Sequence, residues 1–192
     1  MEKQPDNYYV QQVLRGNTAA FTFLVDKYKS LAAAIAYKIT GNAQDAEEVA
    51  QDAFVKAYRA LPGFKAEAKF STWLYRIVYN TAISKTRRKV FFAISLEDAE
   101  LTETNLEQTG YQLLNLQAAE QTKYLDLALA QLPPDENLLL TLFYLHEKSV
   151  EEIQEITSLT KANIKVKLFR ARQKMYSYLQ GLLKQEWKEI IG

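Results

Sequence analysis

The chain of 192 residues contains no cysteine and only one histidine, His146. Without cysteine it has no disulfide framework, no thiol nucleophile and no zinc cluster built on thiolates. One histidine also argues against a Ser-His-Asp triad, since a lone histidine is more often a surface or packing residue. Composition therefore argues against several common enzyme and metal-protein classes.

Long apolar runs are also missing. The N-terminal segment MEKQPDNYY lacks the apolar region of a signal peptide. The longest apolar patch, Leu138 to Leu145, is too short to span a bilayer and is interrupted by Thr141. We therefore expect a cytoplasmic protein without membrane insertion. The length of the chain and its 48% hydrophobic content suit two small globular domains.

Basic residues are absent from the middle of the chain. Residues 91–120 contain six acidic residues and no lysine or arginine, whereas residues 1–90 contain 14 basic and 8 acidic residues. The middle segment is predicted to be an acidic flexible linker. Farther on, six cations and no anion fall between Thr160 and Lys174. Such clustering of cations is the electrostatic pattern expected of a DNA-binding protein.

The first ninety residues show the three-to-four spacing of apolar residues that predicts helices throughout. Asp6 or Asn7 is expected to cap a short helix that turns Val10, Val13 and Leu14 inward.

Two longer helices follow, the first ending at Gly41 and the second running from Asp45 to Leu61. The second turns small side chains inward and carries Glu48, Gln51 and Asp52 on its outer face. This acidic face suits a basic protein partner, or it is simply a solvated surface.

Aromatic rings, hydroxyl groups and cations alternate from Phe64 to Lys89. A helix capped by Ser71 or Thr72 is predicted here, preceded by a loop, residues 61–69, in which Phe64 is suited to stack on an unpaired base. We interpret the stretch as a nucleic-acid-binding surface. A buried aromatic helix with a solvated basic end is the alternative.

The last third of the chain predicts a second helical domain. Pro133 and Pro134 end one helix, and Asp135 is expected to cap the next. Ser149 and Glu152 have the spacing of a capping box at the start of a short helix.

A turn at residues 157–159 then leads into a basic helix, which completes a helix-turn-helix pattern. Its buried seam is predicted to be Ile164, Leu168, Ala171 and Met175. The side chains left for a major groove are Asn163, Lys165, Lys167, Arg170 and Arg172. An ordinary basic surface helix is the alternative.

Several motifs occur in a definite order: DAEEVAQDAF at residues 45–54, FSTWLYRIVYN at residues 70–80, Arg87-Arg88, and LPPDENLLLTLFYLHEKSVEEIQEI followed by FRARQKM. Each is weak alone, but their order around an acidic linker makes the combination specific. Over nearly its whole length, the chain resembles the extracytoplasmic-function sigma factors of bacterial RNA polymerase.

The resemblance implies an all-α fold of two small helical domains joined by a flexible acidic linker, the second domain containing the helix-turn-helix. Residues 1–90 would bind core polymerase and the minus-ten element, residues 91–120 would be the linker, and residues 121–192 would bind the minus-thirty-five element. The implied partners are the beta-prime clamp and beta subunit of the polymerase, promoter DNA and an anti-sigma factor. The resemblance implies promoter melting and transcription initiation, with no catalysis, cofactor or metal.

The resemblance also assigns individual residues. The polymerase-binding candidates are Glu48, Gln51 and Asp52. The minus-ten candidates are Phe64, Lys65, Lys69, Ser71, Thr72, Arg76, Asn80, Arg87 and Arg88. The minus-thirty-five candidates are Thr160, Lys161, Asn163, Lys165, Val166, Lys167 and Arg170.

The recognition helix departs from the family pattern. Lys161 stands where an acid is usual, and Val166 stands where a serine is usual. Val166 is able to touch a thymine methyl group but not to donate a hydrogen bond, so the base preference should differ. Two other classes are also considered: a helix-turn-helix regulator that acts without binding polymerase, and a helical adaptor that does not bind DNA.

Overall fold

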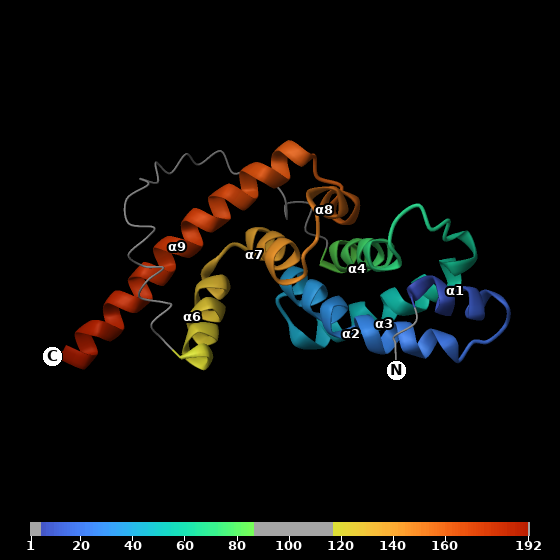
Figure 1. The fold of residues 1–192 in the computed structure, drawn as a ribbon, viewed down its shortest axis with the longest axis horizontal. Coiled ribbons are helices and arrows are strands. Elements are labelled where there is room, and N and C mark those ends of the chain that lie inside the picture. Colours follow the sequence, from blue (N-terminus) through green and yellow to red (C-terminus); the bar gives the residue numbers. More distant parts are fainter. Residues whose placement is uncertain (1–4, 87–116, 192) are drawn as a thin grey trace. The chain divides into compact units, whose positions relative to one another are not determined.

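The computed structural model describes residues 5–86 and 117–191, which form helices joined by short connections (Figure 1). In chain order the elements are α1 (Asp6–Leu14), α2 (Ala20–Thr40), α3 (Ala43–Ala60), the 3-10 helix η1 (Leu61–Gly63), α4 (Phe70–Thr86), α6 (Ala118–Gln131), α7 (Pro134–Leu140), the π-helix η2 (Thr141–Leu145), α8 (Val150–Thr157) and α9 (Lys161–Ile191). Neither described range contains a β-strand. The predicted all-α fold is therefore confirmed.

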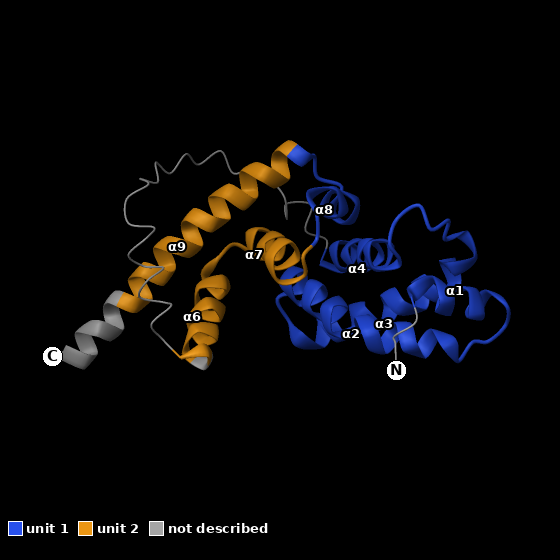
Figure 2. Ribbon diagram, viewed as in Figure 1, with its two compact units in different colours: residues 1–92, 148–161 blue, residues 93–147, 162–192 orange. Residues whose placement is uncertain are grey.

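Contacts divide the chain into two compact units (Figure 2). The first contains residues 1–92 and 148–161, and the second contains residues 93–147 and 162–192. The segment 148–161, which holds α8, was expected in the second domain but is grouped with the first unit. Most of the predicted linker, residues 91–116, lies outside the described residues.

The first unit is built on α2, α3 and α4, with α1 against α2 and α8 against α4. Leu24, Ile35 and Leu74 are among its fully buried side chains. As predicted, α3 turns small residues such as Ala53 and Ala57 inward, which lets neighbouring helices approach closely.

Helix ends in this unit follow local sequence signals in part. Gly41 ends α2 with the left-handed φ of 69° that glycine tolerates best. At α1, however, Pro5 occupies the cap position predicted for Asp6 or Asn7. Asp6 instead pairs with Lys27 of α2.

Two further expectations about this unit are wrong. Leu14 was predicted to face inward, but it lies at the end of α1 and is 42% exposed. Ser71 and Thr72 were predicted as caps, but α4 begins at Phe70, so both lie within its first turn. They are also buried, with exposures of 7% and 1%.

The second unit contains α6, α7, η2 and most of α9. Tyr124 and Ala128 of α6 form a buried cluster with Leu179 and Leu183 of α9. A hydrogen bond also joins α6 to α7. The side-chain amide of Asn137, in the middle of α7, donates to the backbone carbonyl of Leu129 in α6 at 2.6 Å.

The start of α7 differs from prediction because Pro133 is its cap residue and Pro134 its first helical residue. Proline suits this position since its missing N–H would have no helical partner there. Asp135 therefore lies in the first turn and is not the cap. The predicted helix 136–145 also changes character at Thr141, where the π-helix η2 begins.

The capping box at α8 is confirmed. The Ser149 hydroxyl accepts from the Glu152 amide at 3.2 Å, and the Glu152 carboxylate accepts from the Ser149 amide at 3.0 Å. Ser158 then ends α8 with a left-handed φ of 62°, and α9 begins at Lys161. Among the helices the structure describes, none is long and apolar enough to cross a bilayer.

Candidate functional site

The outer face of α3 presents the predicted polymerase-binding residues. Glu48, Gln51 and Asp52 are all exposed there. The Gln51 amide donates to the Glu47 carboxylate at 3.3 Å. The acidic face therefore combines carboxylates with a side-chain amide that is oriented by a neighbour.

One carboxylate of this face also belongs to an ion-pair cluster with α4. Lys85 lies 2.6 Å from Glu48 and 3.0 Å from Asp45. These two acids hold the pKa of Lys85 above its usual range, with the Glu48 hydrogen bond as the largest cause. Asp52 makes no ion pair within the described residues, so its charge is not offset in this way.

An apolar groove of about 630 Å³ lies beside the acidic face, between α2 and α3. Its lining includes Val25, Ala33, Tyr37, Ala46, Ala50 and Phe54, with Glu47 and Gln51 at its edge. Tyr37 is 50% exposed. An apolar centre with a polar rim suits a protein partner. The groove could not be predicted from the sequence, because its lining comes from two helices, α2 and α3.

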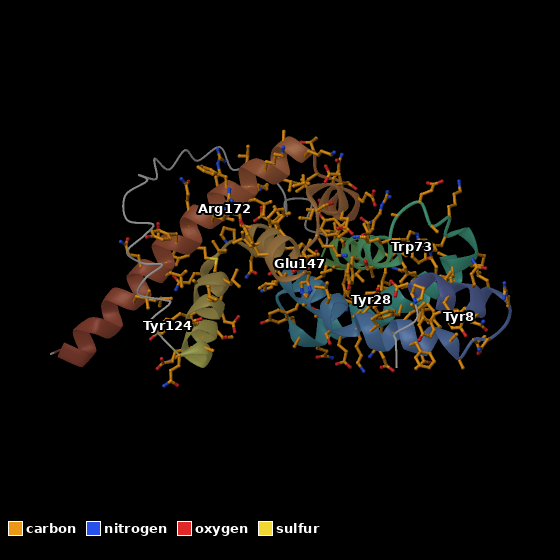
Figure 3. The ribbon with its side chains drawn as sticks, viewed as in Figure 1. Tyr8, Tyr28, Trp73, Tyr124, Glu147 and Arg172 are labelled. Atoms are coloured by element: carbon orange, nitrogen blue, oxygen red, sulfur yellow. The ribbon has the colours of Figure 1, made fainter. Side chains whose placement is uncertain are left out.

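The loop at residues 61–69 forms one wall of a cavity of about 370 Å³. The Phe64 ring packs 5.1 Å from that of Trp73, which α4 carries (Figure 3), and 5.8 Å from that of Phe70. Phe64 is thus half-buried and not fully exposed, with the cavity on one side. Arg76, Glu67 and Glu155 bring charges to the same cavity.

The remaining minus-ten candidates fall into three groups. Lys65, Lys69, Arg76 and Asn80 are exposed. Ser71 and Thr72 are buried, and each forms a hydrogen bond with a residue at the start of α8. The Ser71 hydroxyl accepts from Lys148, which precedes the cap residue Ser149, at 3.0 Å. The Thr72 hydroxyl donates to Glu152 of α8 at 3.1 Å. Arg87 and Arg88 lie outside the described residues.

The start of α9 presents several minus-thirty-five candidates. Lys165 and Val166 are exposed, Asn163 and Arg170 are half-buried, and Thr160 is exposed directly before the helix. Apart from Thr160, these residues lie in the first three turns of α9. Of the four predicted seam residues, Ile164, Leu168 and Ala171 are buried, and Met175 is half-buried.

Lys161 has a defined partner in the structure. Its ammonium lies 2.8 Å from Glu151 of α8 and lowers the pKa of that carboxyl to about 2. Both side chains are more than half exposed, so the pair contributes little to stability.

Other cations of α9 are engaged by the second unit itself. Lys167 lies 2.7 Å from Asp135, with side chains only 11% and 14% exposed. Lys174 lies 2.8 Å from Glu136, and Arg172, labelled in Figure 3, donates to the Tyr144 hydroxyl at 3.1 Å. These contacts hold α9 against α7 and η2, which is a structural role that sequence analysis did not assign.

No group of three or more metal-ligating side chains gathers anywhere in residues 5–86 and 117–191. The surfaces described above consist of exposed charges, amides and aromatic rings, which suit binding to protein and nucleic acid.

Comparison with known proteins identifies the family to which these surfaces belong. Residues 24–91 match the family described as Sigma-70 region 2, and residues 122–175 match Sigma-70, region 4. The RNA polymerase sigma-H factor of Pseudomonas aeruginosa is 33% identical, in an alignment that covers 96% of this chain and 99% of that protein. The chain belongs to the ECF sigma factor family. The predicted family is therefore confirmed.

A second relative supports this sigma factor assignment, and one solved structure shares the fold. The ECF RNA polymerase sigma factor SigW of Bacillus subtilis is 31% identical, covering 90% of this chain and 96% of that protein. The structure of the sigma factor RpoE in complex with the anti-sigma factor NepR from Bartonella quintana has a similar fold. It has a TM-score of 0.57 at 20% identity and covers 83% of this chain and 96% of that one.

As an ECF sigma factor, the protein binds RNA polymerase and directs promoter recognition. It is a transcription initiation factor and not an enzyme. A regulator that acts without polymerase and a helical adaptor without DNA binding, the two other classes considered from sequence, are thereby set aside.

Proposed function

We propose that this sigma factor divides promoter recognition between its two family-matched regions. In the first, α3 binds core polymerase, while α4 and the loop at residues 61–69 bind the melted minus-ten element. In the second, α9 binds the minus-thirty-five element. The proposed domain limits are residues 1–90 and 121–192, with residues 91–120 as the connection.

The observation that carries the polymerase contact is the composition of the α3 surface. Glu48, Gln51 and Asp52 are exposed beside the apolar groove that contains Tyr37. An apolar centre supplies contact area, while the surrounding carboxylates select a basic partner surface. We assign this surface to the beta-prime clamp of the polymerase, with the beta subunit as a second contact.

The minus-ten assignment depends on the cavity beside Phe64. Its aromatic wall of Phe64 and Trp73 suits stacking with an unpaired base, and Arg76 adds a cation at its edge. Lys65, Lys69 and Asn80 would bind the nearby strand. Melting follows because a base held here is unavailable for pairing in the duplex.

The minus-thirty-five assignment rests on the first turns of α9. Asn163 is suited to read an adenine edge, and Val166, which is 48% exposed, is suited to touch a thymine methyl group. Lys161, Lys165 and Arg170 supply charge for the phosphates. Thr160 and Lys167 complete the proposed surface, although Lys167 is also paired with Asp135.

The proposed role also predicts the cellular location of the protein and a further partner. Polymerase and promoter DNA are found in the cytoplasm, and we place the sigma factor there. Since the similar RpoE was solved with an anti-sigma factor, we propose a partner of that class for this chain as well.

Reconstitution with core polymerase tests the proposed function. The purified chain is mixed with bacterial core enzyme, and the complex is separated by gel filtration and supplied with genomic DNA fragments. We expect comigration, together with transcripts whose 5′ ends map to a small set of sites that core enzyme alone does not use. Failure to comigrate would overturn the polymerase assignment, and comigration without specific starts would overturn the promoter assignment.

A further inference from the structure

The loop at residues 61–69 separates two cavities. The cavity beside Phe64, the Phe64 cavity, lies on one side. A second cavity of about 490 Å³ lies on the other side, between the loop and the starts of α1 and α4. Every residue that lines this second cavity belongs to the first compact unit (Figure 2). We call it the α1 cavity.

The wall between the two cavities is a short piece of the loop. Ala66, Glu67 and Ala68 line both cavities, so small side chains lie on either side of Glu67. Ala66 adopts a left-handed φ of 57°, which is uncommon for alanine, and such residues cluster at ligand-binding sites. Because the cavities share this wall, a strand with one base in the Phe64 cavity lies beside the α1 cavity.

The start of α1 supplies polar groups to the α1 cavity. Asp6 and Asn7 line it, and neither side chain caps the helix, because Pro5 is the cap residue. The Asn7 side chain is exposed and makes no hydrogen bond among the described residues. Two residue types that usually cap helices are therefore available for a ligand.

The Asp6 carboxylate is held in a fixed position. The Tyr28 hydroxyl of α2, labelled in Figure 3, donates to one oxygen, and Lys27 Nζ lies 2.5 Å from the other. Burial raises the pKa of Tyr28 well above its usual value, and the Asp6 hydrogen bond raises it further, so Tyr28 remains a donor. A carboxylate has about four acceptor sites, so Asp6 is able to accept another hydrogen bond from a ligand.

Charges around the α1 cavity indicate the class of ligand. Lys69, which also pairs with Glu152, has a side chain that is 73% exposed and is able to contact a phosphate. The carboxylates of Asp6 and Glu67 only accept hydrogen bonds. They suit a base with an exocyclic amino group, which donates, whereas they repel the two carbonyl oxygens of thymine.

We propose that the α1 cavity binds a second unpaired base of the promoter strand that places another base in the Phe64 cavity. Asp6 and Asn7 contact the edge of this second base, which is adenine, cytosine or guanine, and Lys69 contacts an adjoining phosphate. The wall of the loop then lies between two bases of one strand. The proposal rests on the role of Phe64 proposed above, and it adds base selection by α1.

Abasic scanning tests whether two bases are bound. Holoenzyme is titrated with a fluorescent promoter from the start sites mapped by reconstitution, with the minus-ten region held open by mismatches. Each unpaired base is replaced in turn by an abasic site, which removes the base and keeps the backbone. We expect affinity to fall about tenfold at one position that depends on the Phe64 cavity and at a second, on the same strand, that depends on the α1 cavity.

Variants of the two cavities assign these positions. Asn7→Leu fills part of the α1 cavity, so the second position should become insensitive to base removal while the first stays sensitive. Phe64→Leu should abolish the sensitivity of the first position alone. Gln11→Leu is the matched control, because Gln11 is exposed on α1 but does not line the cavity. It should keep both positions sensitive, and circular dichroism melting checks that α1 survives in each variant.

Base preference at the second position tests the role of Asp6. The normal chain should bind adenine, cytosine or guanine there about tenfold more tightly than thymine. Asp6→Asn should bring thymine to within about threefold, because an amide also donates. Lys27→Gln breaks the same ion pair without changing the cavity lining, so it should keep the preference. An equal loss of preference in Lys27→Gln would overturn base reading by Asp6.

The scan separates failure of this proposal from failure of the proposed function. Sensitivity only at the position lost in Phe64→Leu would overturn the second base site and leave the proposed function intact. A second sensitive position that Asn7→Leu leaves unchanged would also overturn it, because another surface then holds that base. If Phe64→Leu abolishes no position, the proposed role of the loop fails, whereas the Asn7→Leu result still decides whether the α1 cavity binds a base.

Discussion

Lys85 of α4 lies 2.6 Å from Glu48 of α3, so an ion pair joins two helices of the first unit at the edge of the proposed polymerase surface. The neighbouring acids raise the pKa of Lys85. A raised lysine pKa means that the pair contributes stability below the unfolded pKa and loses it as pH rises through the folded value. The pair is therefore intact at neutral pH, and Glu48 has a structural partner that Asp52 lacks within the described residues.

This difference predicts unequal effects of charge reversal on polymerase binding. Asp52→Lys should weaken core binding by about 2 kcal/mol, since an exposed contact worth about 1 kcal/mol at 4 Å changes sign. Glu48→Lys should weaken core binding and also repel Lys85, which lowers stability. Titration with labelled core enzyme measures the first effect, and thermal melting measures the second.

Asp26→Lys is the control for these reversals, because Asp26 is also an exposed acid, lies on α2, and pairs only with Lys29 among the described residues. Core affinity that falls as far for Asp26→Lys as for Asp52→Lys would mean that net charge, and not the α3 surface, sets binding.

The Phe64 cavity predicts a defect in promoter opening. Phe64→Leu keeps much of the packing against Trp73 and Phe70 but removes the aromatic face, which is worth about 1 to 3 kcal/mol per stacked base. Permanganate reactivity of the minus-ten thymines should drop, while initial binding to duplex promoter stays close to normal.

Lys65→Gln serves as the comparison for Phe64→Leu, because it removes a loop charge without touching the aromatic wall. It should weaken all DNA binding at low salt and leave the opened fraction of bound promoter unchanged. Normal melting in Phe64→Leu would remove the base-binding role of the loop.

The Lys167–Asp135 pair predicts a stability effect within the second unit. Lys167→Met should destabilise the protein by about 1 to 3 kcal/mol, because it leaves the Asp135 carboxylate little exposed and without this partner. Urea unfolding of the two single variants, Lys167→Met and Asp135→Leu, and of the double variant gives the coupling free energy between the two side chains. We expect the double variant to lose less stability than the sum of the single losses.

Helix ends that depend on neighbouring residues could be predicted from the sequence. Ser149 and Glu152 are three residues apart, and the capping box that they form needs nothing from elsewhere in the chain. Gly41 ends α2 for an equally local reason. The three-to-four spacing of apolar residues likewise identified the buried faces of α3 and α9, because helical periodicity reports which side is buried.

Long-range pairings were not predictable in the same way. Glu152 also binds Thr72, which is 80 positions away, and Lys167 binds Asp135, which is 32 positions away. Periodicity reports that a side is buried but not what covers it. For this reason Thr72 was interpreted as a cap and a DNA contact, and Lys167 as a groove residue, without their partners in the fold.

The start of α9 predicts two different phenotypes for neighbouring polar residues. Asn163 in the first turn is suited to form two hydrogen bonds with adenine, whereas exposed Lys165 is a long point charge suited to phosphate. Asn163→Ala should therefore relax preference at one upstream base pair, at a cost of about 1 to 3 kcal/mol. Lys165→Ala should weaken all sequences alike and reduce the slope of log affinity against log salt by about one.

Both variants are measured in holoenzyme, on a panel of promoters with single-base changes in the minus-thirty-five element and at several salt concentrations. Lys167→Met is included because Lys167 has to leave Asp135 before it contacts phosphate, so the salt slope should fall less than it does for Lys165→Ala. Equal losses across the panel would remove the base-reading role of Asn163. An unaltered slope would remove the phosphate contact of Lys165, and a slope reduced by Lys167→Met would show that Lys167 exchanges Asp135 for DNA on binding.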